Sequence, residues 1–153
     1  RRMQVNLDLK TIAVDFDGTI VEHQYPKIGK EMLFAFETLK LLQKKGNRLI
    51  LWTYRSGKYL DDAVEYCREN GIEFYAVNKS YPEEKFDETI SRKLDCELFI
   101  DDRNVGGFIG WGEVYRTLYP DGDEFEHILS NADAHYNNRS KVIVKLKALF
   151  AMK

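Results

Sequence analysis

The stretch that decides the fold of this chain is Thr11-Ile12-Ala13-Val14-Asp15-Phe16-Asp17-Gly18-Thr19. Its first four residues predict a buried β-strand, and two carboxylates follow where such a strand meets water. Alternation along an extended chain places Asp15 and Asp17 on one side, about 7 Å apart at Cα. Two carboxylates this close repel each other, so a cation, a proton or nearby donors must compensate them. Gly18 permits a sharp turn, and Thr19 can direct its hydroxyl or amide toward an anion.

Length and composition predict one domain over residues 1–153. The chain is 44% hydrophobic and 31% charged, a balance typical of folded proteins. A net charge of −2 gives no reason to expect nucleic acid or an anionic membrane as a partner. The sequence has no apolar stretch of the roughly 20 residues that span a bilayer. Cys67 and Cys96 have no metal-ligand spacing, and we expect reduced thiols in a cytoplasmic protein.

Apolar strands alternate with amphipathic helices along the chain, which favours an α/β fold with a doubly wound parallel sheet. The predicted strands are 11–15, 48–52, 74–77 and 98–100. The predicted helices are 30–45, about 58–70, a short one near 85–93 and another after the glycines of 106–112. Such a sheet is expected to be covered on both faces.

The last part of the chain, residues 120–153, is predicted to be a helical extension of the same domain. Its final helix combines an apolar stripe with several lysines and no acidic residue. A basic amphipathic helix can bind RNA, a membrane surface or a partner. We favour packing on its own domain or across a homo-oligomer, because the apolar stripe needs a partner surface.

Polar residues follow three of the predicted strands directly. Asp15 and Asp17 end the first, Thr53 ends the second, and Asp101 and Asp102 end the last. The carboxyl ends of parallel strands gather at one edge of a sheet, where ligands bind. These side chains are therefore expected to share one site.

This set of motifs resembles the haloacid dehalogenase superfamily of phosphohydrolases, over residues 11 to about 119. The segments that resemble its four motifs are Asp15-Phe16-Asp17-Gly18-Thr19, Leu49-Ile50-Leu51-Trp52-Thr53, Lys93 and Phe99-Ile100-Asp101-Asp102. Two further strings are similar to small capless members, some of them associated with surface-polysaccharide pathways: Thr53-Tyr54-Arg55 and Asp101-Asp102-Arg103-Asn104-Val105-Gly106-Gly107. The resemblance implies a Rossmann-like core without a cap domain.

The resemblance also implies a reaction, the Mg²⁺-dependent hydrolysis of a small phosphomonoester through an aspartyl-phosphate. Asp15 would attack phosphorus. Asp17 would protonate the leaving alcohol, then activate water, and would lend its main-chain carbonyl to the metal. Thr53 would donate to a phosphoryl oxygen, and Lys93 would stabilise the phosphoryl group and the Asp15 carboxylate.

Two of these assignments have alternatives. Either Asp101 or Asp102 can be the third metal ligand, and we favour Asp102 because the second acid of such pairs fills that role in the family. Lys79 and Lys85 compete with Lys93, which we favour for its spacing of eight residues to the acidic pair.

Arg55 lies two residues after Thr53, and two interpretations of it stay open. Its guanidinium can hold a second anionic group of the substrate near the pocket mouth, or it can form a salt bridge to Asp61 or Asp62.

The intervals 22–29 and 53–93 are too short for a cap domain, so we expect an open site. The physiological substrate is not named by the sequence. A sugar phosphate of surface-polysaccharide metabolism is our first hypothesis. A nucleotide phosphatase and a catalytically idle binding module are the alternatives. A base-stacking aromatic residue near the pocket would favour the nucleotide, and paired polar groups would favour the sugar.

Overall fold

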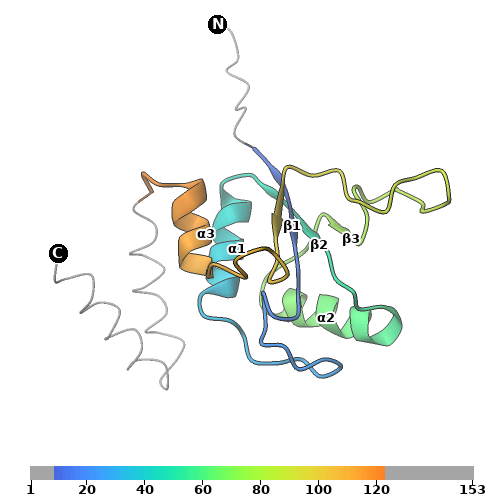
Figure 1. Ribbon diagram of the computed structural model, residues 1–153, viewed down its shortest axis with the longest axis horizontal. Coiled ribbons are helices and arrows are strands. Elements are labelled where there is room, and N and C mark those ends of the chain that lie inside the picture. The colour runs from blue at the N-terminus through green and yellow to red at the C-terminus, as the bar shows by residue number, and fades with distance from the viewer. Residues whose placement is uncertain (1–8, 123–153) are drawn as a thin grey trace, which may run out of the picture. The chain divides into compact units, whose positions relative to one another are not determined.

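The computed structural model describes residues 9–122 and shows one parallel sheet with helices (Figure 1). The sheet has four strands in the order β3-β2-β1-β4. The strands are β1 (Thr11–Val14), β2 (Arg48–Leu51), β3 (Ala76–Val77) and β4 (Leu98–Ile100). The helices are α1 (Ala35–Lys44), α2 (Gly57–Glu69) and α3 (Trp111–Leu118). The fold is α/β and Rossmann-like, which confirms the predicted class.

The chain divides into two compact units, Arg1–Ile109 and Gly110–Lys153. The first unit holds the sheet, α1 and α2. In the second unit, α3 buries Trp111, Val114 and Tyr115, and the rings of Tyr115 and Tyr119 lie 5.4 Å apart.

The register of the sheet aligns the carboxyl ends of its central strands. Val14 pairs with Leu51 on one side and with Ile100 on the other. The amide of Asp15 then donates to the carbonyl of Ile100, with N and O 2.9 Å apart. The residues that follow β1, β2 and β4 therefore meet at one edge, as the strand-end argument predicts.

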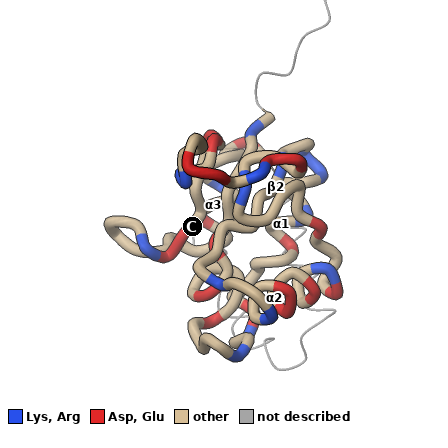
Figure 2. Tube along the Cα trace, turned by 90° about the vertical axis from the view of Figure 1, so that its right-hand side faces the viewer, with Lys and Arg blue, Asp and Glu red and all other residues tan. Residues whose placement is uncertain are grey.

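Helices α1 and α2 contact each other through an aromatic pair. The rings of Phe36 on α1 and Tyr66 on α2 lie 5.7 Å apart. Right-handed crossovers from β1 to β2 and from β2 to β3 place both helices on one face of the sheet. On α2, Ala63 and Cys67 are buried four residues apart, whereas its acidic and basic residues are exposed (Figure 2). This periodicity is that of an amphipathic helix.

The opposite face of the sheet is covered by irregular chain. Leu94 packs there on one residue from each of β1, β2 and β3, namely Ala13, Ile50 and Ala76. The segment from 78 to 97 that carries Leu94 contains no helix. The short helix predicted near 85–93 is therefore wrong.

Local hydrogen bonds explain the missing helix. The Asp87 carboxylate accepts from both the amide and the hydroxyl of Thr89, at 2.7 and 2.5 Å. A side chain that satisfies the backbone in this way competes with helical hydrogen bonding and favours a turn.

The first helix also begins later than predicted, at Ala35 instead of residue 30. The preceding residue, Phe34, has a left-handed φ of 65° that a helix cannot include. Residues 30–32 bond to the loop after β1 instead: the amide of Glu22 donates to Lys30, and that of Met32 donates to Ile20.

The helices predicted within 123–153, and the oligomer contact assigned to them, lie outside the described residues. Between Thr53 and Lys93 the structure holds only α2, β3 and irregular chain. None of the helices in the described part has the length and apolar character required to cross a bilayer.

We expect Leu94→Ala to lower the free energy of unfolding by about 2–4 kcal/mol, because it leaves a cavity between the segment 78–97 and the sheet. Urea denaturation measures the loss. Val105→Ala is the control, since Val105 is fully exposed. Equal effects of the two substitutions would show that Leu94 does not hold the segment from 78 to 97 on the sheet.

Candidate active site

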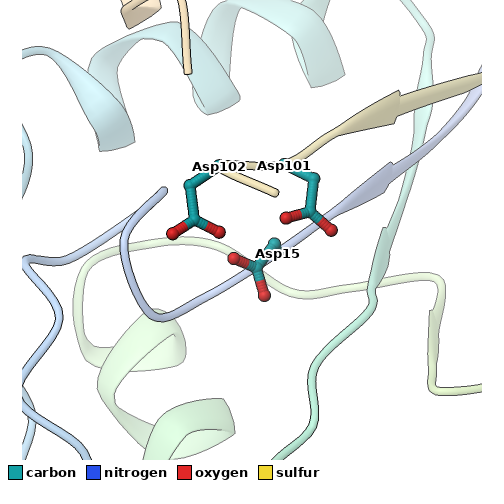
Figure 3. Close-up of side chains that lie close together, drawn as sticks. All are labelled: Asp15, Asp101 and Asp102. Atoms are coloured by element: carbon teal, nitrogen blue, oxygen red, sulfur yellow. The ribbon is translucent and has the colours of Figure 1, made fainter. Parts of the chain in front are cut away.

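Three carboxylates converge at the carboxyl edge of the sheet (Figure 3). Asp15 follows β1, and Asp101 and Asp102 follow β4. One oxygen from each lies within 4.8 Å of the others. The two strands pair directly, so their register alone brings the three side chains together. Both members of the Asp101-Asp102 pair take part.

The environment of Asp15 disfavours its ionised form. Burial, the charge of Asp101 and a hydrogen bond with Asp102, in that order of importance, raise the pKa of Asp15 from 3.8 to about 8. Donation from the backbone of Phe16 and from the Thr19 hydroxyl, whose oxygen lies 3.1 Å from Asp15 Oδ2, only partly offsets this. A divalent cation among the three carboxylates would instead favour the ionised form of Asp15.

The environment of Asp102 also favours a cation between the three carboxylates. Its Oδ1 is buried and has no hydrogen-bond partner among the described residues. An unsatisfied buried carboxylate oxygen is costly, and a hard cation is the kind of partner it suits. Gly18, at φ 85°, lies against the other oxygen, because a Cβ added to it would collide with Asp102 Oδ2. Gly18 is thus required both for the turn and for the position of Asp102.

Asp17 is neutralised by Arg55. The guanidinium binds both carboxylate oxygens, Nε to Oδ2 at 2.7 Å and Nη2 to Oδ1 at 2.8 Å. The Arg55 side chain is 1% exposed and that of Asp17 is 12% exposed. Planar bidentate pairs of this kind are the strongest carboxylate contacts that arginine makes. The Asp17 carboxylate is accordingly not part of the acidic cluster of Asp15, Asp101 and Asp102.

The rest of the Arg55 guanidinium is also occupied. Nη1 donates to the carbonyls of Pro26 and Tyr59, and Nη2 donates to that of Lys27. The guanidinium also lies over the Phe16 and Tyr25 rings, at 5.0 and 5.2 Å from their centroids.

Arg55 lines the pocket, and its position differs from the predicted salt bridge to Asp61 or Asp62. The structure pairs this side chain with Asp17 and with neither Asp61 nor Asp62, and it holds the guanidinium inside the protein, where its donors are used.

Asp15 and Asp101 open into a pocket of about 380 Å³, whereas Asp102 is not among its lining residues. The pocket is lined by Asp15, Asp17, His23, Tyr25, Trp52, Thr53, Tyr54, Arg55, Asp101 and Arg103. Thr53 is held there by two hydrogen bonds: its amide donates to Asn78 Oδ1 at 2.8 Å, and its hydroxyl oxygen accepts from the amide of Arg55 at 3.1 Å.

Asn78 is a positioning residue that the sequence analysis missed. Its left-handed φ of 52° is a conformation that asparagine tolerates better than most residues. The sequence signal that could have identified it is an asparagine directly after the predicted strand 74–77, at the strand end where the site residues gather.

The motif lysine is not brought to the pocket. Lys93 is exposed, and it is not among the residues that line the pocket. Neither of its competitors lines the pocket either: Lys79 is half-buried and Lys85 is exposed.

Fold and site together define an α/β protein with a carboxylate-lined pocket at the carboxyl edge of a parallel sheet. A solved structure of a conserved protein from Bacteroides thetaiotaomicron is 54% identical to this chain, with a TM-score of 0.70. The match covers 84% of this chain and 99% of that one. The chain belongs to the same family as that protein. No protein-family model and no curated protein matches the chain.

Removing Arg55 should leave the Asp17 charge buried without a partner. We expect Arg55→Met to lower the free energy of unfolding by about 3–5 kcal/mol. The double variant Arg55→Met/Asp17→Asn should recover much of this loss, since it carries no buried charge. Arg68→Met is the control, because the Arg68–Glu65 pair is exposed and should contribute about 1 kcal/mol or less. A single variant no less stable than this control would contradict the buried ion pair.

Asp15→Asn should stabilise the metal-free protein, and more so as the pH rises. Folded wild type keeps the Asp15 proton up to a pKa of about 8, whereas the unfolded chain loses it near 3.8. The contribution of the protonated Asp15 to wild-type stability is therefore complete below the unfolded pKa and is lost as the pH rises through the folded pKa. The difference in Tm between variant and wild type, measured in EDTA, should grow from about pH 5 to about pH 8. A difference independent of pH would contradict the shifted pKa.

Proposed function

We propose that this protein is a Mg²⁺-dependent phosphomonoesterase that acts through an aspartyl-phosphate on Asp15. The observation that carries the proposal is the acidic cluster of Asp15, Asp101 and Asp102, in which one buried Asp102 oxygen has no hydrogen-bond partner within residues 9–122. Carboxylate oxygens are the ligands that Mg²⁺ takes in proteins, and these three residues would hold it. When bound, Mg²⁺ offsets the negative charge that would otherwise repel a phosphate dianion.

Asp15 is the nucleophile in this proposal. One of its oxygens forms a bond to phosphorus while the bond from phosphorus to the leaving oxygen breaks, which yields an aspartyl-phosphate and an alcohol. Thr19 donates to Asp15 Oδ2 and thereby orients the carboxylate. Water then hydrolyses the aspartyl-phosphate to inorganic phosphate and regenerates Asp15.

Asp17 is assigned to proton transfer, because it lines the same pocket without joining the acidic cluster. It would pass a proton to the leaving alcohol and take one from the attacking water. The bidentate contact with Arg55 fixes the position of its carboxylate during both transfers. The contribution of Arg55 is thus to position Asp17.

Thr53 is assigned to the phosphoryl group. Its hydroxyl oxygen already accepts a hydrogen bond from the Arg55 amide, so the hydroxyl hydrogen is available to donate into the pocket. A donor directed at a phosphoryl oxygen stabilises the charge that it carries in the transition state. The role of Lys93 in the same task stays a prediction.

Turnover should require both the metal and the Asp15 carboxylate. We expect EDTA to abolish the hydrolysis of p-nitrophenyl phosphate and added Mg²⁺ to restore it. Asp15→Asn should retain the fold and lose turnover by at least about a thousandfold, because the amide is a poor nucleophile.

Asp61→Asn, at an exposed position on α2, is the matched control and should remain active. Full activity in the demetallated wild type would refute the metal mechanism. Substantial activity in Asp15→Asn would indicate direct attack by water.

A further inference from the structure

The pocket is lined by aromatic residues as well as by carboxylates. Three of its lining residues, Tyr25, Trp52 and Tyr54, present rings, and all lie in the first unit with the carboxylates. Trp52 is half-buried and packs against the core of the sheet. The aromatic residues of the pocket therefore range from the half-buried Trp52 to the exposed Tyr25 and Tyr54.

Tyr54 is the most exposed aromatic side chain of the described residues, at 96%. Its two chain neighbours are hydrogen-bonded: the Thr53 amide donates to Asn78, and the Arg55 amide donates to Thr53. The loop thus presents a large ring to solvent from an ordered position, directly next to the hydroxyl assigned to the phosphoryl group. A ring held in water in this way is suited to contact a bound molecule.

Tyr25 lies on the same pocket and is also restrained. Its ring is 49% exposed. The Arg55 guanidinium lies 5.2 Å from its centroid, and the Tyr59 ring packs against it with centroids 5.7 Å apart. The cation–π contact and the edge-on ring restrict its orientation, so little conformational freedom is lost when a ligand contacts it.

The polar groups of the pocket are largely committed elsewhere. Asp17 is bound by Arg55, and Asp15 and Asp101 belong to the acidic cluster. Apart from the polar atoms of the rings, His23 and Arg103 remain to contact a leaving group. A polyol needs several paired donors and acceptors, whereas a planar ring needs aromatic faces and a few donors at its edge.

We propose that the pocket binds phosphomonoesters whose leaving group carries a planar aromatic ring, with nucleoside monophosphates as the substrate class. The base stacks on the exposed tyrosine side of the pocket while the phosphate lies at the acidic cluster, and Arg103 donates to acceptor atoms at the edge of the base. This inference rests on the proposed phosphatase function and chooses the nucleotide over the sugar phosphate.

Binding and turnover test the inference separately. Asp15→Asn is titrated calorimetrically, with Mg²⁺, against adenosine 5′-monophosphate and ribose 5-phosphate, and wild type is assayed for hydrolysis of both. The two ligands share a phosphorylated ribose and differ in the base. We expect the nucleotide to bind at least about tenfold more tightly, as base stacking on one aromatic side chain supplies an effect of this size.

The source of the preference is tested in the same background. Adding Tyr54→Ala should reduce nucleotide affinity about tenfold and leave ribose 5-phosphate unchanged, whereas Tyr54→Trp should retain the preference. Tyr81→Ala is the control, since Tyr81 is also exposed and does not line the pocket.

Equal affinity for the two ligands, or a preference that survives Tyr54→Ala, would overturn the inference about the substrate class. If wild type still hydrolysed both compounds, the proposed phosphatase function would stand. A Tyr54-dependent preference without hydrolysis of either compound would support the ring site and refute the proposed reaction.

Discussion

The pocket depends on the buried ion pair between Arg55 and Asp17. One guanidinium joins the loop after β1, the link at Pro26 and Lys27, and the start of α2 at Tyr59. No hydrophobic side chain could make these contacts, because each uses a donor in the plane of the guanidinium. The pair therefore determines the shape of the pocket as well as the position of the Asp17 carboxylate.

The same pair divides the acidic residues at the sheet edge into two electrostatic classes. Asp17 has its own cation, whereas the pKa of Asp15 is raised by burial and by Asp101 and Asp102. Within residues 9–122, the groups that act on Asp15 include no basic side chain. Such an arrangement is costly for the protein alone and becomes favourable when a divalent cation is bound. The cationic partner of the Asp17 carboxylate distinguishes the proposed proton-transfer group from Asp15, the proposed nucleophile and metal ligand.

The architecture also explains why the leaving group of a substrate would contact side chains of the unit that holds the sheet. Between Thr53 and Lys93 the chain forms only α2, β3 and the segment that Leu94 holds on the sheet. The residues beside the carboxylates are then those of short loops after β1 and β2. Tyr25 and Tyr54 occupy these loops; the Tyr25 ring lies against the Arg55 guanidinium, and the residues on either side of Tyr54 are hydrogen-bonded. Under the proposed function, specificity would rest on a few exposed rings.

The sequence by itself determined the parallel sheet and the meeting of its strand-end residues. Apolar periodicity is local, and the register of Val14 with Leu51 and Ile100 then brings Asp15 and Asp101 to one edge. Only the tertiary structure decided the partner of Arg55, since Asp17 is 38 residues away and nearer acids were available on α2. The same holds for Asn78, which reaches Thr53 across 25 residues, and for Lys93, whose spacing to Asp101 does not bring it to the pocket. The segment near 85–93 failed as a helix because the Asp87 side chain satisfies the backbone that a helix would use. Spacing along the chain predicts which strand ends meet, whereas the pairing of side chains from distant loops depends on where the packed backbone places them.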